Sequence, residues 1–248
     1  MNVILHFKND FENYMRANLA ANGFRPVPTE INELYIGYCN ILLRRIEPHK
    51  RKIQKSDVFE CPKKFREGLQ TLESAILKGD NLLPWQSKNI LNTGYHDRLF
   101  YDHGIRHLHL GEKKEDDSNF MLRTGSLLYC IVDLKTVYFI QILEHGEENP
   151  GELVATAKNN WPDLFPHFND GQRTFGRLSP AAEGDRLQSL LTHYEDMVKE
   201  NADAFMRQVK RLTKTQPETL EFHLMITPEG IACAEEIHSK LRFKLGVI

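Results

Sequence analysis

Two histidines spaced two residues apart are the side chains of this sequence best placed to do chemistry. His107 and His109 lie in the stretch DHGIRHLHLG (102–111), which also contains Arg106. In an extended strand, residues i and i+2 point to the same face, so we expect the two imidazoles side by side, with leucines on the other face. Imidazoles titrate near neutral pH, and two of them can share the roles of general acid and general base.

Such a pair suits RNA cleavage by attack of the 2′-hydroxyl on the adjacent phosphate. One group removes the proton of the hydroxyl, another protonates the leaving 5′-oxygen, and a cation stabilises the charge on the phosphorane. The sequence offers five catalytic candidates for these roles: His107, His109, His145, Arg123 and Arg106.

The same residues have two other interpretations. An HxH pair on a half-buried strand is often an ordinary polar face with simple hydrogen bonds, and spacing alone favours that view. With a third ligand from His145, His103 or Asp102, the pair could also hold zinc or iron. No further carboxylate stands at a diagnostic spacing, so we expect neither a metal nor a cofactor.

Composition excludes several classes of protein. The 248 residues have a net charge of −2, so no global field draws the protein to nucleic acid and any such binding needs a local patch. The N-terminus lacks the pattern of a signal peptide, no apolar run approaches the ~20 residues of a membrane span, and the four cysteines form no CxxC pair. We therefore expect a cytoplasmic protein without a membrane partner. Walker, GxGxxG, GxSxG and HExxH motifs are absent.

Local positive charge is found in two segments. Residues 44–56 contain six basic residues against one acidic residue, Glu47, which fits either a solvated linker or an arm that contacts phosphates. A charged loop follows the histidine strand. The candidate RNA-binding residues of the two segments are Lys50, Arg51, Lys52, Lys113 and Lys114.

Hydrophobic periodicity predicts an α+β fold with N-terminal helices, a central antiparallel β meander packed on a helix, and a C-terminal α-β-α-β segment. Helices are expected over 10–23, 28–48, 61–84, 151–162, 185–214 and 228–240. Strands are expected over 1–7, 104–110, 125–133, 136–145, 219–227 and 241–248. The segment rich in Gly, Pro and Asp at 163–185 reads as a linker or long loop. The expected divisions are 1–55, 56–168 and 180–248.

Residues 65–165 resemble the YafO-type mRNA interferases, which are RelE-like toxins of bacterial toxin–antitoxin systems. The resemblance rests on FREGLQTLESAILKGDNLLP, DRLFYDHGIRHLHLG and GSLLYCIVDLKTVYFIQILEHG in this order. It implies a RelE-like core, metal-independent endoribonuclease activity on mRNA, RNA or the ribosome as partner, and silencing by a small antitoxin protein. Of the matching positions, His107 and His109 are the ones implied to be functional.

The chain is about twice the expected size of such a compact toxin. The additional segments fit an inhibitory module fused in cis, a dimerisation element or a substrate-targeting domain. The alternative from another class is a non-enzymatic interaction protein of a mobile element or defence system, in which the histidine face is a plain surface or a partner interface.

Overall fold

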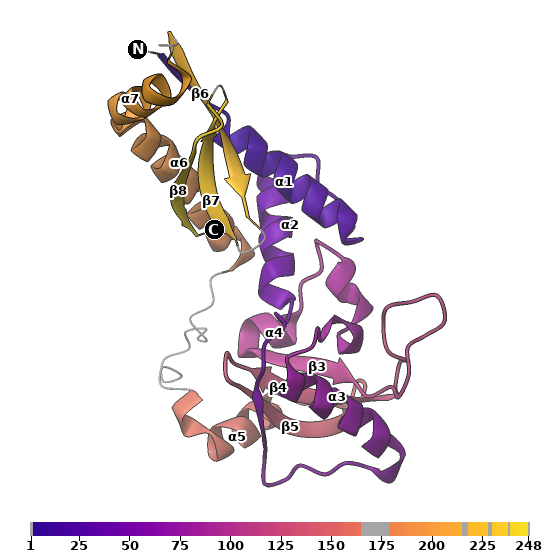
Figure 1. The fold of residues 1–248 in the computed structure, drawn as a ribbon. Helices are drawn as coiled ribbons and strands as arrows, with labels where there is room; N and C mark the ends of the chain where they lie inside the picture. The colour runs from indigo at the N-terminus through magenta and orange to yellow at the C-terminus, as the bar shows by residue number, and fades with distance from the viewer. Residues whose placement is uncertain (1, 165–178, 215–217, 228–229, 238, 248) are drawn as a thin grey trace. The chain divides into compact units, whose positions relative to one another are not determined.

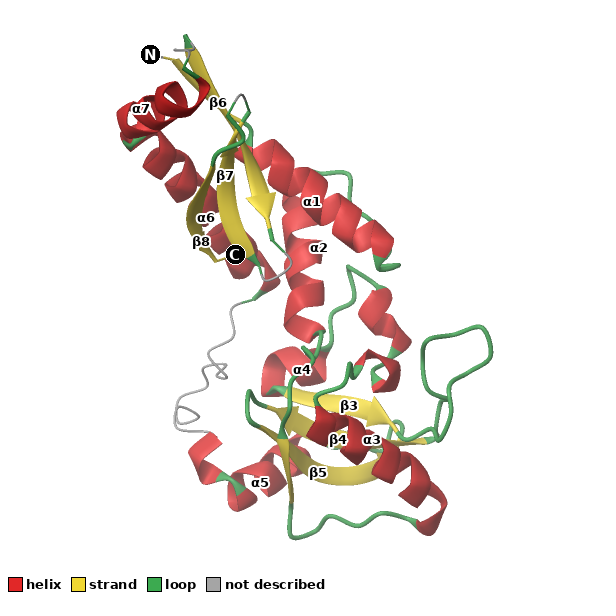
Figure 2. Cartoon of the chain, in the orientation of Figure 1, coloured by secondary structure: helices red, strands yellow, loops and turns green. Residues whose placement is uncertain are grey.

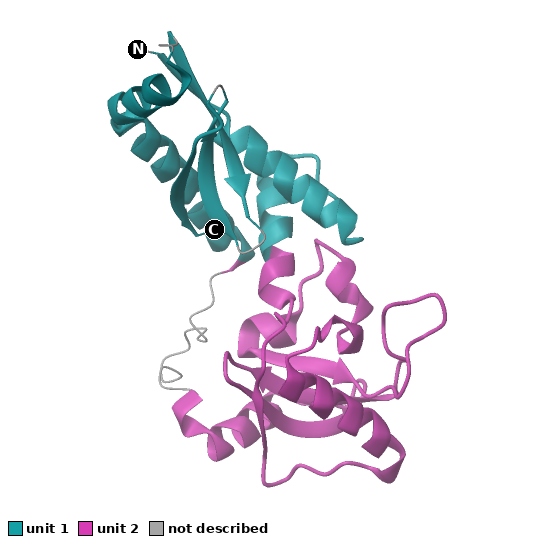
Figure 3. Cartoon of the chain, in the orientation of Figure 1, with its two compact units in different colours: residues 1–39, 180–248 teal, residues 40–179 magenta. Residues whose placement is uncertain are grey.

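The computed structural model describes residues 2–164, 179–214, 218–227, 230–237 and 239–247, and these form two compact units (Figure 3). Unit 1 comprises residues 1–39 and 180–248, and unit 2 comprises residues 40–179. Both units mix helices with a four-stranded sheet, which confirms the α+β class (Figure 2). None of the described helices is long and apolar enough to cross a bilayer.

The sheet of unit 2 contains the expected meander (Figure 1). Strands β3, β4 and β5 pair antiparallel in sequence order, and β2 adds a parallel edge to β5, which makes the sheet mixed. The strands are β2 (Lys52–Lys55), β3 (Ile105–His109), β4 (Ser126–Val132) and β5 (Thr136–Glu144). Whether this arrangement is specifically RelE-like stays a prediction.

Helices pack against both faces of this sheet. The helices of unit 2 are α3 (Arg66–Lys78), α4 (Arg98–His103) and α5 (Pro150–Asn160). The apolar stripe of α3, which includes Leu69, Leu72 and Ile76, packs with Leu108 of β3 on one face. On the other face, Leu153 and Ala157 of α5 pack with Leu127, Tyr129 and Ile140. Trp161 joins that second cluster and lies 5.0 Å from Tyr138 between ring centroids, so it is a packing anchor for this face of the sheet.

Unit 1 joins the two ends of the chain in one sheet of order β1-β6-β7-β8. Its strands are β1 (Asn2–Leu5), β6 (Thr219–Ile226), β7 (Ile231–Glu236) and β8 (Arg242–Val247), and β1 pairs parallel with β6. Its helices are α1 (Phe7–Ala21), α6 (Pro180–Glu200) and α7 (Ala202–Thr213), and α2 (Ile31–Arg44) begins in unit 1 and ends in unit 2. The division at 1–55 and 180–248 therefore differs from the units found, because strand pairing unites the two ends of the chain.

Three expectations on individual elements were wrong. The described residues of 228–240 do not form a helix, because the segment Ile231–Glu236 alternates between buried and half-buried positions and pairs with strands on both sides. The long helix expected at 185–214 is divided at Asn201, beyond which Phe205 packs on two aromatic rings of the sheet. The connector 44–56 is not a solvated linker, because it contains β2. The loop expected at 163–185 lies largely outside the described residues.

A close backbone approach fixes α3 against the end of the histidine strand. A Cβ atom added at Gly68 of α3 would lie 1.9 Å from the carbonyl oxygen of Leu110. Alanine normally stabilises a helix relative to glycine by about 1 kcal/mol. We expect Gly68→Ala to lower the free energy of unfolding by roughly 1–3 kcal/mol instead, because the added methyl overpacks a rigid backbone contact.

Urea unfolding followed by tryptophan fluorescence measures this change in unit 2, since Trp85 and Trp161 are the two tryptophans of the chain and both lie there. Gly125→Ala is the matched control, because a Cβ at that position meets no atom within 4 Å. A Gly68→Ala protein as stable as the control would contradict the close approach.

Candidate functional site

Unit 2 contains a cavity of about 570 Å³ beside the histidine strand. The histidines that line it are His96, His103, His107, His109 and His145. Its charged side chains are Asp97, Arg98, Asp102, Arg123 and Glu148. Such a concentration of titratable groups in one concavity is typical of an active site.

The pleat of β3 points its two histidines into this cavity. His107 pairs with Tyr129 across the sheet and His109 pairs with Leu127, so all four side chains share one face. The imidazole centroids are 6.4 Å apart and the ring planes lie at 85° to one another. The expectation that the two imidazoles share one face, with Leu108 buried on the other, is therefore confirmed.

His109 is a buried, neutral imidazole held by an arginine. The residue is only 4% exposed, and the Arg123 guanidinium lies 2.8 Å from its Nε2 atom. Because guanidinium groups only donate, Nε2 accepts this hydrogen bond and the ring proton is assigned to Nδ1. Burial, then Arg123 and the neighbouring histidines, lower the pKa of His109 to about 3. The Nδ1 atom is buried without a hydrogen-bond partner in the described structure, which is a feature common at functional sites.

His107 is also shifted toward the neutral form. Burial lowers its pKa, and His145 and Arg123 lower it further, while the carboxylates of Asp97 and Glu148 act in the opposite direction. An anion bound between these groups would favour the protonated imidazole, because an opposite charge stabilises it. The state of His107 thus depends on what occupies the cavity.

Glu148 supplies a carboxylate to the lining of the cavity. Burial would raise its pKa, but backbone amides of Glu148 and Gly146, the Tyr129 hydroxyl and His145 together hold it below its ordinary value. The Gly146 amide donates to Glu148 Oε2 at 2.7 Å. Burial and the Glu148 carboxylate raise the pKa of Tyr129. The cavity therefore contains an ionised carboxylate and a neutral phenol at neutral pH.

A buried polar network positions the wall of the cavity opposite β3. The Arg44 guanidinium, at the end of α2, donates to the carbonyls of Asn89 and Asn92 at 2.9 and 2.6 Å and to Asn40 Oδ1 at 2.9 Å. These contacts fix the segment between the short 3-10 turn Lys88–Leu91 and α4. Asp97 then caps α4 by accepting from the Phe100 amide at 3.1 Å.

The structure brings four of the five catalytic candidates together and separates the fifth. His107, His109, His145 and Arg123 all line the cavity. Arg106 is buried on the opposite face of β3, where it donates to the carbonyls of Arg44 and Leu43 and lies over the Phe100 ring. Strand alternation explains this difference, because residues 106 and 107 must point to opposite faces.

The candidate RNA-binding residues also fall into two groups. Lys113 and Lys114 are exposed in the loop between β3 and β4, and Lys50 and Lys52 are exposed beside and within β2. Arg51 is buried and donates to the carbonyls of Asp133, Glu47 and His49 at 2.8, 2.9 and 3.2 Å. Arg51 thus binds its own backbone and is not part of a phosphate-contacting arm.

Several lining residues were missed by the sequence analysis. His96 and Asp97 precede α4, and Asp97 has the ordinary signature of an N-cap residue, which gave no functional signal. Tyr129 is placed by its register opposite His107, which the sequence does not specify. Glu148 could have been noticed, because it follows the third strand of the meander three residues after His145.

The cavity histidines do not form a close metal-ligand cluster. Within the described part of the chain, three or more His, Cys, Asp or Glu ligand atoms lie within 4.8 Å of one another only in unit 1, at His6, Glu221 and His223. The reading of His107 and His109 as zinc or iron ligands with His145, His103 or Asp102 gains no support from this geometry. Comparisons of the chain with protein-family profiles, curated proteins and solved structures find no match.

The low pKa of His109 predicts a pH-dependent stability. Between about pH 6.5 and pH 3 the unfolded chain binds a proton at this position and the folded chain does not, so the free energy of unfolding falls as the pH is lowered through that window. We expect the parent protein to lose roughly 1–2 kcal/mol more than His109→Gln between pH 7 and pH 5. The Gln side chain keeps an acceptor for Arg123.

Urea unfolding at the two pH values, again followed by tryptophan fluorescence, checks this difference. The control is His49→Gln, since His49 is exposed and its side chain makes no hydrogen bond with a described residue. Equal losses in the parent and in His109→Gln would mean that His109 does not stay neutral in the folded protein.

Proposed function

We propose that the cavity of unit 2 is the active site of a toxin-like endoribonuclease that cleaves mRNA by acid–base chemistry and requires no metal for the chemical step. The observation that carries the proposal is the convergence of His107, His109, Arg123 and His145 in one cavity, with Glu148 beside them. The resemblance of residues 65–165 to YafO-type interferases points to the same activity.

The reaction that these groups fit is transfer of the phosphate to its own 2′-oxygen. The 2′-hydroxyl loses its proton and attacks phosphorus, the bond to the 5′-oxygen breaks, and that oxygen receives a proton. His107 and His109 are the acid–base pair of the proposal, and His109 can act only once bound substrate draws the Arg123 guanidinium away from its Nε2 atom. Glu148 adds an ionised carboxylate, whose charge favours the protonated form of His107.

Charge on the phosphate explains how imidazoles with low pKa values can serve as acids. A phosphodiester in the cavity offsets the positive charge of Arg123, which is one of the groups that lower the pKa of both histidines. Bound substrate therefore shifts both imidazoles toward their protonated forms, against the burial that is the largest cause of their lowered pKa values. Arg123 and His145 would face the charge that develops on the phosphorane.

The loop between β3 and β4 offers a path for the RNA backbone. Its two arms pair, because the Leu122 amide donates to the Lys113 carbonyl at 2.8 Å. The exposed lysines Lys113 and Lys114 thus belong to the same hairpin-like loop that leads into Arg123. Both lysines would contact phosphates on the approach to the cavity. The proposal places the protein in the cytoplasm, with mRNA or the ribosome as partner and a small antitoxin protein as its inhibitor.

Cleavage of RNA by the purified chain tests this function. We expect His107→Ala and His109→Ala each to lower the cleavage rate by about 10²–10⁴-fold, because each removes an acid or base. His49→Ala is the matched control, and cleavage should persist in EDTA. Gel analysis of a labelled mRNA, with growth arrest on induced expression as a second readout, measures the effect. An inactive parent would favour the non-enzymatic interaction protein, and full cleavage by the double mutant of His107 and His109 would rule out the acid–base pair proposed here.

Binding of an uncleavable RNA tests the proposed link between phosphate and protonation. A 2′-O-methyl oligonucleotide lacks the nucleophile, and the charge of its phosphodiesters is constant near neutral pH. We expect it to bind more tightly at pH 5.5 than at pH 8, because the bound anion raises the pKa of the histidines and binding takes up protons. Fluorescence anisotropy measures the affinity. His107→Gln should flatten this pH dependence, and an unchanged profile would remove His107 from the phosphate site.

A further inference from the structure

Unit 1 carries a second group of chemistry-bearing side chains, which the proposed function does not use. His6 follows β1 directly, and Glu221 and His223 lie two residues apart on β6. These three side chains offer ligand atoms that all lie within 4.8 Å of one another. Glu221 and His223 occupy the face of β6 opposite to the buried Phe222, and each remains partly exposed.

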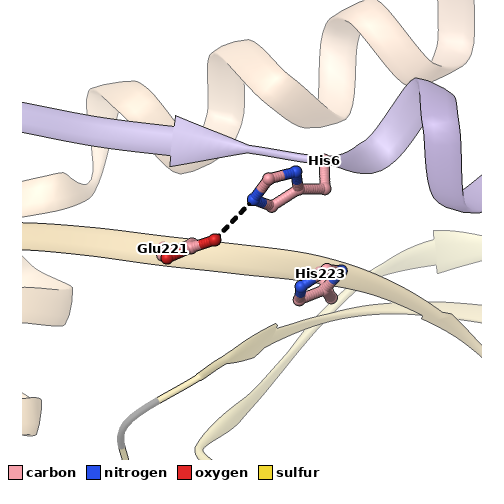
Figure 4. A group of neighbouring side chains, drawn as sticks. All are labelled: His6, Glu221 and His223. Carbon is pink, nitrogen blue, oxygen red and sulfur yellow. Dashed lines mark hydrogen bonds and ion pairs between the residues drawn. The ribbon is translucent and has the colours of Figure 1, made fainter.

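Parallel strand pairing creates this group from the two ends of the chain. Leu5 is in register with Phe222, and the His6 amide donates to the Phe222 carbonyl at 3.1 Å. The His6 and His223 rings are stacked, with centroids 4.6 Å apart and an angle of 13° between their planes. Figure 4 shows His6 just beyond the end of β1 and His223 on β6, with the Glu221 carboxylate facing His6. The pairing of β1 with β6 therefore fixes the backbone positions from which all three side chains extend.

Asp10, in the first turns of α1, orients one of the two histidines. Both of its carboxylate oxygens lie 3.0 Å from Nδ1 of His223, and Oδ2 also accepts from the Leu224 amide at 2.8 Å. A carboxylate in this position holds the proton on Nδ1 and leaves the Nε2 lone pair free. The same carboxylate–histidine arrangement orients imidazole ligands in metal sites.

The other histidine contacts the acidic ligand directly. His6 Nε2 and Glu221 Oε1 are 2.6 Å apart, which is a hydrogen bond. Two ligands of a tetrahedral zinc ion at ordinary bond lengths lie roughly 3.4 Å apart, so a cation between these atoms requires them to separate by less than about 1 Å. The side chains of His6, Glu221 and His223 are 32%, 32% and 42% exposed, so they have room to rotate and solvent can reach the site.

We propose that His6, Glu221 and His223 bind one divalent first-row transition-metal ion, with Asp10 as a positioning residue and water at the fourth ligand position. Two imidazoles and a carboxylate suit Zn²⁺ and its neighbours better than Mg²⁺ or Ca²⁺, which prefer oxygen ligands alone. His6 and Glu221 are 215 positions apart, so the ion links the N-terminal strand to the C-terminal strands. Metal binding then stabilises unit 1, because the unfolded chain has no preformed site.

Titration of the untagged full chain with Zn²⁺, followed by calorimetry, and with Co²⁺, followed by visible absorption, tests this site. We expect one ion per chain and a higher thermal midpoint in Zn²⁺. His6→Gln and His223→Gln should abolish binding, and Asp10→Asn should weaken it about 10–100-fold. His193→Gln is the matched control, since this histidine is exposed on α6 of the same unit and should bind as the parent does.

Glu221→Gln keeps the test decisive if the histidine variants fold poorly. Its amide can still hydrogen-bond to His6, so far-UV circular dichroism without metal should match the parent, while Zn²⁺ affinity and the thermal shift are lost. Absence of binding at one ion per chain, or unchanged affinity in Glu221→Gln, overturns the proposal. Zn²⁺ binding that is lost in His107→Gln and retained in Glu221→Gln also overturns it, by placing the ion among the cavity histidines.

Discussion

The candidate site depends on a buried contact between the end of α2 and the strand that carries the histidines. The last carbonyls of a helix have no partner within the helix and carry partial negative charge. Arg106 of β3 donates to two of them, those of Leu43 and Arg44, and the Gln86 side chain donates to the Arg44 carbonyl as well. The Arg44 side chain then holds the carbonyls of the facing wall. Two buried guanidiniums thus set the distance between the wall and the strand.

The pleat of β3 points the side chains of neighbouring residues to opposite faces of the sheet. Arg106 and Leu108 face the helices α2 and α3, and His107 and His109 face the cavity. Structure and chemistry are therefore coupled, because a shift of one residue in register would exchange the two sets. The same burial that stabilises the strand also keeps the imidazoles neutral, since a charged ring is costly away from water.

The two units gather their functional candidates in different ways. Those of unit 2 come from a continuous part of the chain, in which hairpins bring β3, β4 and β5 together. Those of unit 1 come from opposite ends, and only the parallel pairing of β1 with β6 makes them neighbours. Local sequence patterns can indicate the first kind of site. They cannot indicate the second kind, because the contacts that form it are not local.

The sequence by itself determined the period of the elements and therefore which residues share a face. The alternation in Ile105–His109 predicted the paired imidazoles, and the helical stripe of α3 predicted its buried side. Tertiary structure decided the rest. It made a strand of Ile231–Glu236, where pairing on both sides outweighed local helix propensity. It also buried Arg51 and Arg106, whose guanidinium groups donate to backbone carbonyls. A guanidinium can be buried where such acceptors surround it, and composition does not reveal where those acceptors lie.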